Sequence, residues 1–313
     1  MLLAVVPLGA ALLCAPPVAA ADARTDRPAA AFAPLPTGAL HNAYRVTDKV
    51  LSGAAPEGEA SFAALRDLGV KTVISVDGAR PDVETARRFG LRYVHLPIGY
   101  DDVAPREARA IARAIDEVDG PVYVHCHHGR HRSAAAVATA CVMNRRLRPE
   151  QAVSVLRTFG TGANYRGLWA SALGARPLDP AELAAVKVDY REAAPIPPLA
   201  EAMVEIDQTL DRLKLAEKAG WRSPALHPDV DPPHEALQLM EKLRELGRTD
   251  DARVRPEQYR KMLAEGEAGA RTLHESLLAW SAAGRAGAPP AKAAASMKAI
   301  GSSCAGCHKS FRD

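Results

Sequence analysis

The chain has 313 residues, which is enough for two domains of ordinary size. Hydrophobic residues make up 48% and charged residues 25%, as in globular rather than disordered proteins. The formal net charge is only +3 and is spread along the chain, so no nucleic-acid partner is expected.

Residues 1–21 predict a secretory signal peptide. They are apolar and end in small residues, with a cleavage site near Ala19 to Ala21. Three prolines interrupt the apolar run, so no stable membrane span is expected after cleavage. No Lys or Arg follows Met1, and the bulky Leu13 disfavours a lipoprotein anchored through Cys14. We therefore expect a periplasmic or otherwise exported protein.

Residues 22–38 are rich in Pro and Ala and predict a linker. Between residues 39 and 180, short apolar strands then alternate with amphipathic helices. The expected strands are 44–53 (a strand pair), 70–76, 91–98 and 121–126, and the expected helices are 59–69, 82–90, 105–118, 133–146, 148–160 and 164–173. This alternation predicts an α/β domain with a mostly parallel sheet covered by helices.

A second Pro-rich linker is expected at residues 181–198, because its prolines interrupt helical structure. Residues 199–313 contain no strand pattern. Apolar residues recur there at helical spacing in 199–220, 233–247, 255–284 and 290–312. Four such helices predict an all-α four-helix bundle.

Residues 122–133 read "VYVHCHHGRHRS" and join a buried strand to an apolar helix. In α/β folds ligands bind at the carboxyl ends of strands, and a loop there that runs into a helix N-terminus presents backbone N–H groups to anions. Cys126 starts this loop, Gly129 allows a tight turn, and Arg132 can bind two oxygens of a phosphate. The loop therefore predicts a phosphate site; a plain basic loop is the alternative.

The order Cys, five residues, Arg, Ser in "HCHHGRHRS" resembles the signature of the cysteine-dependent phosphatases. Residues 39–180, including "YRV…LSGAAP" and "LRYVHLPIGYDD", are similar to the dual-specificity-like branch. The resemblance implies a phosphocysteine mechanism. Its roles fall on Cys126 (nucleophile), Arg132 (phosphate clamp), Ser133 (hydrogen bond to the departing thiolate), His125 (support of the loop from beneath), and His127, His128, Gly129, Arg130 and His131 (phosphate-binding loop).

Family members also use an aspartic acid upstream of the cysteine as general acid. Asp101 and Asp102 in "GYDDVAP" match that place, and Asp101 is favoured although spacing does not separate the two. A loop turn and a helix cap before Pro105 are the structural alternative for this pair.

Three histidines fill the loop where the family has small or varied residues, which implies an unusual substrate or a pH-tuned loop. A metal site of Cys126, His127, His128 and His131 is disfavoured, because a strand-to-helix turn separates these side chains and no zinc spacing is present. No metal is therefore expected at the phosphatase site. Cys141 lies in an apolar helix and is expected to pack in the core.

The chain ends with "SSCAGCHKSFRD", which contains the C-x-x-C-H attachment signal for c-type haem. Cys304 and Cys307 would form the thioethers, and His308 would bind the iron. A redox pair or half of a zinc site is the alternative. Haem attachment also removes any need for disulfides.

A C-x-x-C-H motif on the last of four helices resembles the cytochrome c′ and c-556 family, over about residues 199–313. The resemblance places Met203 opposite the iron. If Met203 instead packs in the core, the iron would be five-coordinate and able to bind a gas. The remaining candidates have less support, and they are Met240, Met262, Met297, His227, His234 and His274. Cytochromes of this kind often pair through their helices, so a homodimer is one expectation.

Together these patterns predict an exported phosphatase for phosphate monoesters that also carries haem for electron transfer or redox or gas sensing. Its partners would be a phosphorylated substrate of unknown type and a redox partner. The alternative is a periplasmic c-type cytochrome whose phosphatase-like domain only binds an oxyanion.

Overall fold

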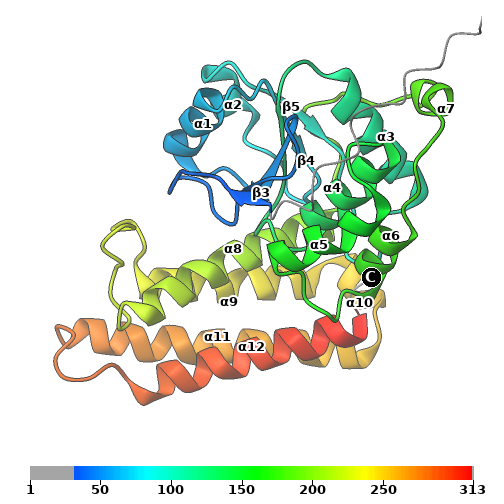
Figure 1. Cartoon of the computed structure of the whole chain (residues 1–313). Helices are drawn as coiled ribbons and strands as arrows, with labels where there is room; N and C mark the ends of the chain where they lie inside the picture. The colour runs from blue at the N-terminus through cyan, green and yellow to red at the C-terminus, as the bar shows by residue number, and fades with distance from the viewer. Residues whose placement is uncertain (1–31, 312–313) are drawn as a thin grey trace, which may run out of the picture. The chain divides into compact units, whose positions relative to one another are not determined.

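The computed structural model describes residues 32–311. The predicted signal peptide and the first part of the 22–38 linker lie outside the described residues. Within the described part, an α/β domain with a mixed, mostly parallel sheet comes first and a helical region follows it (Figure 1). Both parts follow the order of elements predicted from the sequence.

Six strands form one sheet in the order β1-β2-β3-β6-β4-β5. Their bounds are β1 (Ala33–Pro34), β2 (Tyr44–Arg45), β3 (Val50–Ala54), β4 (Thr72–Ser75), β5 (Arg92–His95) and β6 (Val122–Cys126). The pairs β3–β6, β6–β4 and β4–β5 are parallel, whereas β1 and β2 add antiparallel pairs at one edge. The predicted strand pair at 44–53 is confirmed as β2 and β3. The strand ending in Cys126 therefore lies in the middle of the sheet.

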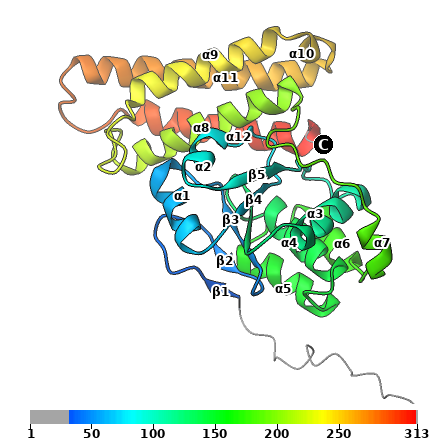
Figure 2. The ribbon, with the colours of Figure 1, turned by 90° about the horizontal axis from the view of Figure 1, so that it is seen from above.

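Helices cover both faces of this sheet, as Figure 2 shows. Helices α1 (Gly58–Asp67) and α2 (Val83–Arg88) pack on one face, around Phe62, Leu65 and Tyr123. The other face carries α3 (Pro105–Glu117), α4 (Arg132–Met143), α5 (Pro149–Phe159) and α6 (Arg166–Gly174). Apolar residues of β6 alternate between the two cores, since Val122 and Val124 face one and Tyr123 faces the other. The strand is fully buried, as its β-branched sequence predicts.

The segments expected to be linkers contribute structure of their own. Residues 22–38 include β1, and 181–198 overlap α7 (Pro180–Ala184). The following chain then runs along the edge strand β5, where His95 N donates to Arg191 O (3.0 Å) and Ala194 N donates to His95 Nδ1 (3.0 Å). Backbone groups of an edge strand need partners, which explains why a proline-rich segment packs there.

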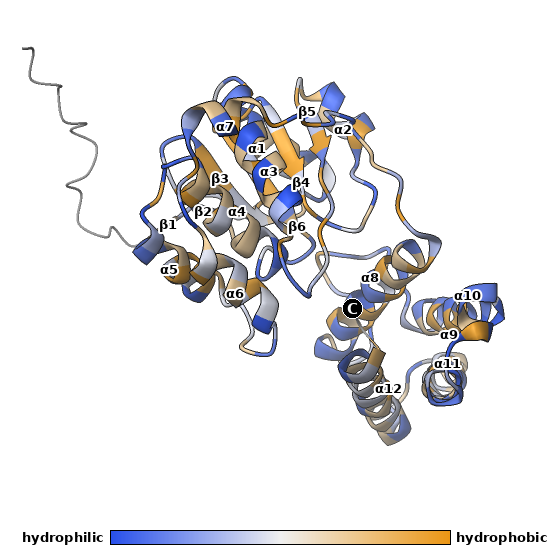
Figure 3. Cartoon of the chain, turned by 90° about the vertical axis from the view of Figure 1, so that its right-hand side faces the viewer, coloured by the Kyte–Doolittle hydropathy of each residue, from blue (hydrophilic) through white to orange (hydrophobic). Residues whose placement is uncertain are grey.

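The helical region has its own core. It consists of α8 (Pro198–Lys218), α9 (Pro232–Arg248), α10 (Asp250–Val254), α11 (Glu257–Ala282) and α12 (Ala291–Phe311). The long helices turn apolar faces toward one another and polar faces outward (Figure 3), and Leu213, Leu273 and Trp221 are buried between them. Helix α10 was not predicted; Thr249 caps it by accepting from Ala252 N (3.2 Å). Among residues 32–311, no helix is both long and apolar enough to span a bilayer.

Candidate active site

Cys126 ends β6 and is buried at the carboxyl edge of the sheet. Its Sγ is hydrogen-bonded to Ser133 Oγ at 3.3 Å. Ser133 is also buried, and its hydroxyl donates to Gly53 O at 3.5 Å. Helix α4 begins at Arg132, so its N-terminal end follows the loop that Cys126 starts. The Cys126 thiol thus donates to a hydroxyl oxygen and lies near the positive end of a helix dipole.

Neighbouring elements hold the backbone of the loop 127–131. The three hydrogen bonds are Ala55 N to His127 O (3.0 Å), Asn42 Nδ2 to Gly129 O (3.0 Å) and Thr161 Oγ1 to Arg130 O (2.6 Å). In a trans peptide the C=O and the following N–H point to opposite sides. The N–H groups of His128, Arg130 and His131 are therefore turned away from these anchors, as an anion cradle requires.

Gly129 is required for this loop shape. Its φ of +68° lies in the left-handed region, and a Cβ there would be 2.3 Å from both Ala54 N and Gly53 C. The loop thus passes directly over the end of β3, closer than a side chain would allow.

Arg132 is buried and paired with a carboxylate that the sequence reasoning missed. Its Nη2 donates to Asp77 Oδ1 at 2.8 Å. Burial disfavours charge on Asp77, but Arg132, together with smaller effects of neighbouring histidines and of the Ala79 N–H group, outweighs burial and lowers the pKa of the carboxyl group. Asp77 follows β4, which pairs with β6, and that position in "TVISVD" was the available signal. Arg132 Nε is buried without a hydrogen-bond partner among the described residues, so the guanidinium keeps an unused donor.

The loop expected to supply the general acid approaches this arginine. The Arg132 guanidinium carbon lies 4.2 Å from the centroid of the Tyr100 ring, which in turn packs on Tyr165 at 5.3 Å. Asp101 and Asp102 follow Tyr100 directly and are exposed. The Asp101 carbonyl touches α6 closely, because a Cβ on Gly167 would be 1.3 Å from that oxygen. The loop is therefore next to Arg132, and neither aspartate is singled out as the acid.

His125 lies in the core below the loop. Its ring packs against Tyr93 (5.8 Å between centroids) and Tyr123 (6.2 Å). Burial lowers the pKa of His125 to about 4, so the ring is neutral near pH 7. Its place agrees with support from beneath rather than reaction.

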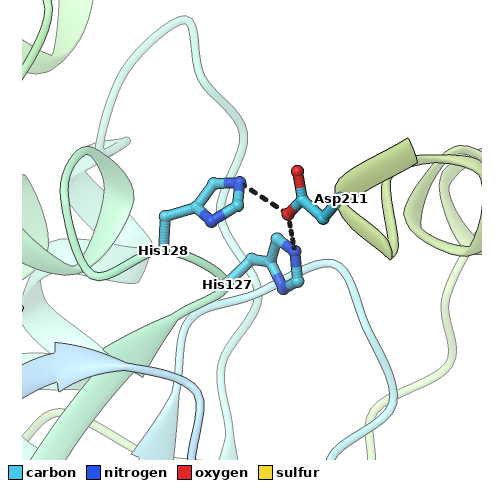
Figure 4. Close-up of side chains that lie close together, drawn as sticks. All are labelled: His127, His128 and Asp211. Carbon is cyan, nitrogen blue, oxygen red and sulfur yellow. Dashed lines mark ion pairs between the residues drawn. The ribbon is translucent and has the colours of Figure 1, made fainter. Parts of the chain in front are cut away.

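The other loop histidines point in different directions. His131 packs on Tyr165 at 4.3 Å, and its Nδ1 accepts from Gly162 N at 3.3 Å. His127 and His128 instead project toward α8 (Figure 4). Cys141 is fully buried in α4, where burial raises the pKa of its thiol to about 12. It is a core residue, as its sequence context predicts.

The C-x-x-C-H motif lies on α12. Cys304, Cys307 and His308 are spaced i, i+3 and i+4, so they share one face of that helix. Both cysteines are half-buried free thiols that pack, together with Met203 of α8, against the core of the helical region. Burial raises the pKa of Cys304, and the nearby Asp207 carboxylate adds to this. Asp207 is one turn beyond Met203, so the thiols and Met203 border the same side of the core. This donor set fits a c-type haem.

Comparisons with known proteins concern the first part of the chain. Residues 51–145 match a family described as "Polymorphic toxin system, DSP-PTPase phosphatase". The segment is similar to a phosphatase. Over 142 residues the chain is 37% identical to "Dual specificity protein phosphatase TpbA" of Pseudomonas aeruginosa, which corresponds to 44% of this chain and 62% of TpbA. The chain thus spans less than two thirds of that curated relative.

Two solved structures of P. aeruginosa TpbA were also found. The first is 26% identical, with a TM-score of 0.41, and the match covers 49% of this chain and 94% of that one. The second is a cysteine-to-serine variant in complex with phosphotyrosine. It has the same identity of 26% and TM-score of 0.41, and the match covers 47% and 91% of the two chains.

Proposed function

We propose that this protein is a cysteine-dependent phosphatase that hydrolyses phosphate monoesters through a phosphocysteine. The observation that carries the proposal is the buried Arg132 at the start of the helix that follows the Cys126 loop. Its Nε has no hydrogen-bond partner among residues 32–311. A buried cation with an unused donor suits an incoming oxyanion. The match of residues 51–145 to a phosphatase family supports the same conclusion.

In the first step, Cys126 Sγ attacks phosphorus and the bond from phosphorus to the ester oxygen breaks. Arg132 and the loop N–H groups stabilise the charge on the non-bridging oxygens. The leaving oxygen takes a proton from the acid on the loop 96–104. In the second step, water attacks phosphorus, the same carboxylate takes the water proton, and the S–P bond breaks. Ser133 donates a hydrogen bond from its hydroxyl to the departing thiolate, which leaves as an anion.

Asp101 or Asp102 is the proposed general acid. The contact of Tyr100 with Arg132 supports this, because both aspartates directly follow Tyr100 in the chain. An acid matters most for a poor leaving group, so loss of the acid should slow phenyl phosphate more than para-nitrophenyl phosphate. Asp101→Asn and Asp102→Asn should therefore be compared on both esters.

We further propose that the helical region is a four-helix haem domain, in which Cys304 and Cys307 would hold a c-type haem through thioethers and His308 and Met203 would bind its iron. The shared core position of the thiols and Met203 supports this. When bound, the haem would supply electron transfer or gas binding. Haem of this type is attached outside the cytoplasm, so the proposal includes export. Cys304→Ser with Cys307→Ser should abolish covalent haem, and Met203→Ala should change the iron spin state.

The deciding experiment assays para-nitrophenyl phosphate with the full chain, as wild type and as Cys126→Ser. We expect turnover that disappears in the variant, while phosphate protects both proteins from thermal unfolding. Phosphorylated protein side chains are the first natural substrates to test, because the curated relative is named a dual-specificity protein phosphatase. Binding without turnover in the wild type would instead make this domain an oxyanion-binding module.

A further inference from the structure

Two histidines of the phosphate-binding loop converge on Asp211 of α8, and Asp207 of the same helix lies close by. His127 Nε2 lies 3.4 Å from Asp211 Oδ2, and His128 Nε2 lies 3.6 Å from the same oxygen (Figure 4). Asp207 Oδ2 is 3.9 Å from His127 Nε2 and 3.8 Å from His128 Nε2. Asp207 and Asp211 are four residues apart, so both carboxylates lie on one face of α8.

These separations fit a shared cation. Ligand atoms about 2.0–2.2 Å from a tetrahedral Zn²⁺ are about 3.3–3.6 Å from one another. The pairs with Asp211 fall in this range, and ligand atoms of His127, His128 and Asp211 all lie within 4.8 Å of one another. Asp207 lies farther from both rings, so its carboxylate would have to move to become the fourth ligand. Two imidazoles and two carboxylates are also ligands that zinc accepts.

The imidazole–carboxylate contacts are longer than good N–H···O hydrogen bonds. His127 Nε2 is buried, and its ion pair with Asp211 Oδ2 at 3.4 Å leaves it without a hydrogen bond of good geometry. The other Asp211 oxygen is held by Lys214 Nζ at 2.7 Å. Lys214 therefore fixes the carboxylate with one oxygen turned to the imidazoles, as outer-shell partners of metal ligands do.

We propose that His127, His128, Asp207 and Asp211 form a site for Zn²⁺ or a similar divalent cation, which fastens α8 to the phosphate-binding loop. The two histidines directly follow Cys126, so a bound cation would fasten the loop to α8 and restrict its movement. A loop held in this way would exchange its anionic substrate more slowly. The cation would thus act as an inhibitor of the proposed phosphatase.

The first test measures binding alone and does not depend on the proposed activity. Zn²⁺ is titrated calorimetrically into the full chain carrying Cys126→Ser, which removes the reactive thiol. The same titration is run with Asp207→Asn and Asp211→Asn added together. The control adds Glu201→Gln, an exposed acid on α8. Any zinc that binds Cys304 and Cys307 in haem-free protein would bind equally in all three proteins, so it would not affect the comparison.

We expect the control to bind one more equivalent than the double aspartate variant, or to bind that equivalent at least 100-fold more tightly. Equal stoichiometry and affinity in the three proteins would overturn the site. A second test rests on the proposed function and keeps Cys126. Zinc should lower turnover in the wild type and in Glu201→Gln, and much less in the double variant. Equal inhibition in all three would place the zinc at the Cys126 thiolate and overturn the inhibitory role.

Discussion

At the scale of single residues, the centre of the site is a buried ion pair. Asp77 and Arg132 face each other at 2.8 Å with side chains only 3% and 7% exposed. A buried pair need not stabilise the fold relative to apolar residues, but removal of one partner leaves the other charge uncompensated. An anion that binds Arg132 would supply part of the missing charge.

Asp77→Asn should therefore lower the free energy of unfolding by about 3 kcal/mol. Orthovanadate or phosphate should then stabilise the variant more than the wild type, because the oxyanion compensates Arg132. Asp116→Asn is the matched control, because the ion pair of Asp116 with Arg146 at 2.9 Å is partly exposed. Its loss should lower the free energy of unfolding by less than about 1 kcal/mol. Chemical denaturation with and without the anion measures both effects, and equal losses in the two variants would refute the argument.

His125 should make the fold sensitive to mild acid. Its pKa of about 4 is below the usual 6.5, so the unfolded chain binds the proton more readily as pH falls below 6.5. Stability should decrease from about pH 6.5 to about pH 4, and burial of His95 adds to the effect because it also lowers that pKa. The substitution His125→Gln should remove up to about 3 kcal/mol of this acid-induced loss of stability. An unchanged pH slope in the variant would contradict the assignment.

At the scale of elements, the crossing of the loop over β3 can be tested at Gly129. In Gly129→Ala, the alanine would be strained at the positive φ of this position, and its Cβ would clash with Ala54 N. Gly90→Ala is the control, because Gly90 has a φ of +72° with no atom within 4 Å of the added Cβ. We expect Gly90→Ala to cost about 1 kcal/mol with normal turnover and Gly129→Ala to lose at least 100-fold in kcat/KM. Similar turnover in both variants would show that the close crossing is not needed.

The contact between the acid loop and α6 gives a second element-level prediction. A Cβ on Gly167 would displace the Asp101 carbonyl, so Gly167→Ala should move the loop that carries Asp101 and Asp102. Turnover of phenyl phosphate should fall more than that of para-nitrophenyl phosphate. The control is Gly174→Ala at the end of the same helix, where no atom is within 4 Å. Equal losses on the two esters would mean that the acid is not on this loop.

The elements were more predictable than the contacts between them. Local patterns were enough for β6, the Cys126 loop and α4, because apolar strands and helices with Gly, Ser and Pro at their ends carry strong signals. Asp77 was missed because its role depends on β4 lying beside β6, which no local pattern shows. The sequence predicts that the side chains of the loop histidines point in different directions. This is correct for His131 but wrong for His127 and His128, which both approach Asp211. Asp211 is more than 80 residues away in the chain, so no local pattern shows this contact.

At the scale of the whole molecule, the described chain has separate cores for the α/β domain and the helical region. Leu156→Ala and Leu213→Ala are a matched pair of fully buried truncations, one in each core. Each should cost about 2–5 kcal/mol. Calorimetry of the full chain should show two unfolding transitions. Each variant should lower the Tm of the transition that belongs to its own core and leave the other Tm unchanged. A single transition lowered equally by both variants would show that the two cores unfold as one unit.

Cys141 has a consequence for the redox behaviour of the nucleophile. A reactive cysteine that is oxidised to a sulfenic acid is often rescued by a second, resolving thiolate in the same protein. Cys141 cannot serve in that way, because it is fully buried and a pKa of about 12 keeps it a thiol. If Cys304 and Cys307 are bound to haem, they are also occupied. No cysteine of the part of the chain that the structure describes would then be left to resolve an oxidised Cys126. Its recovery would depend on a small external thiol, and the rate should follow the concentration of that reductant.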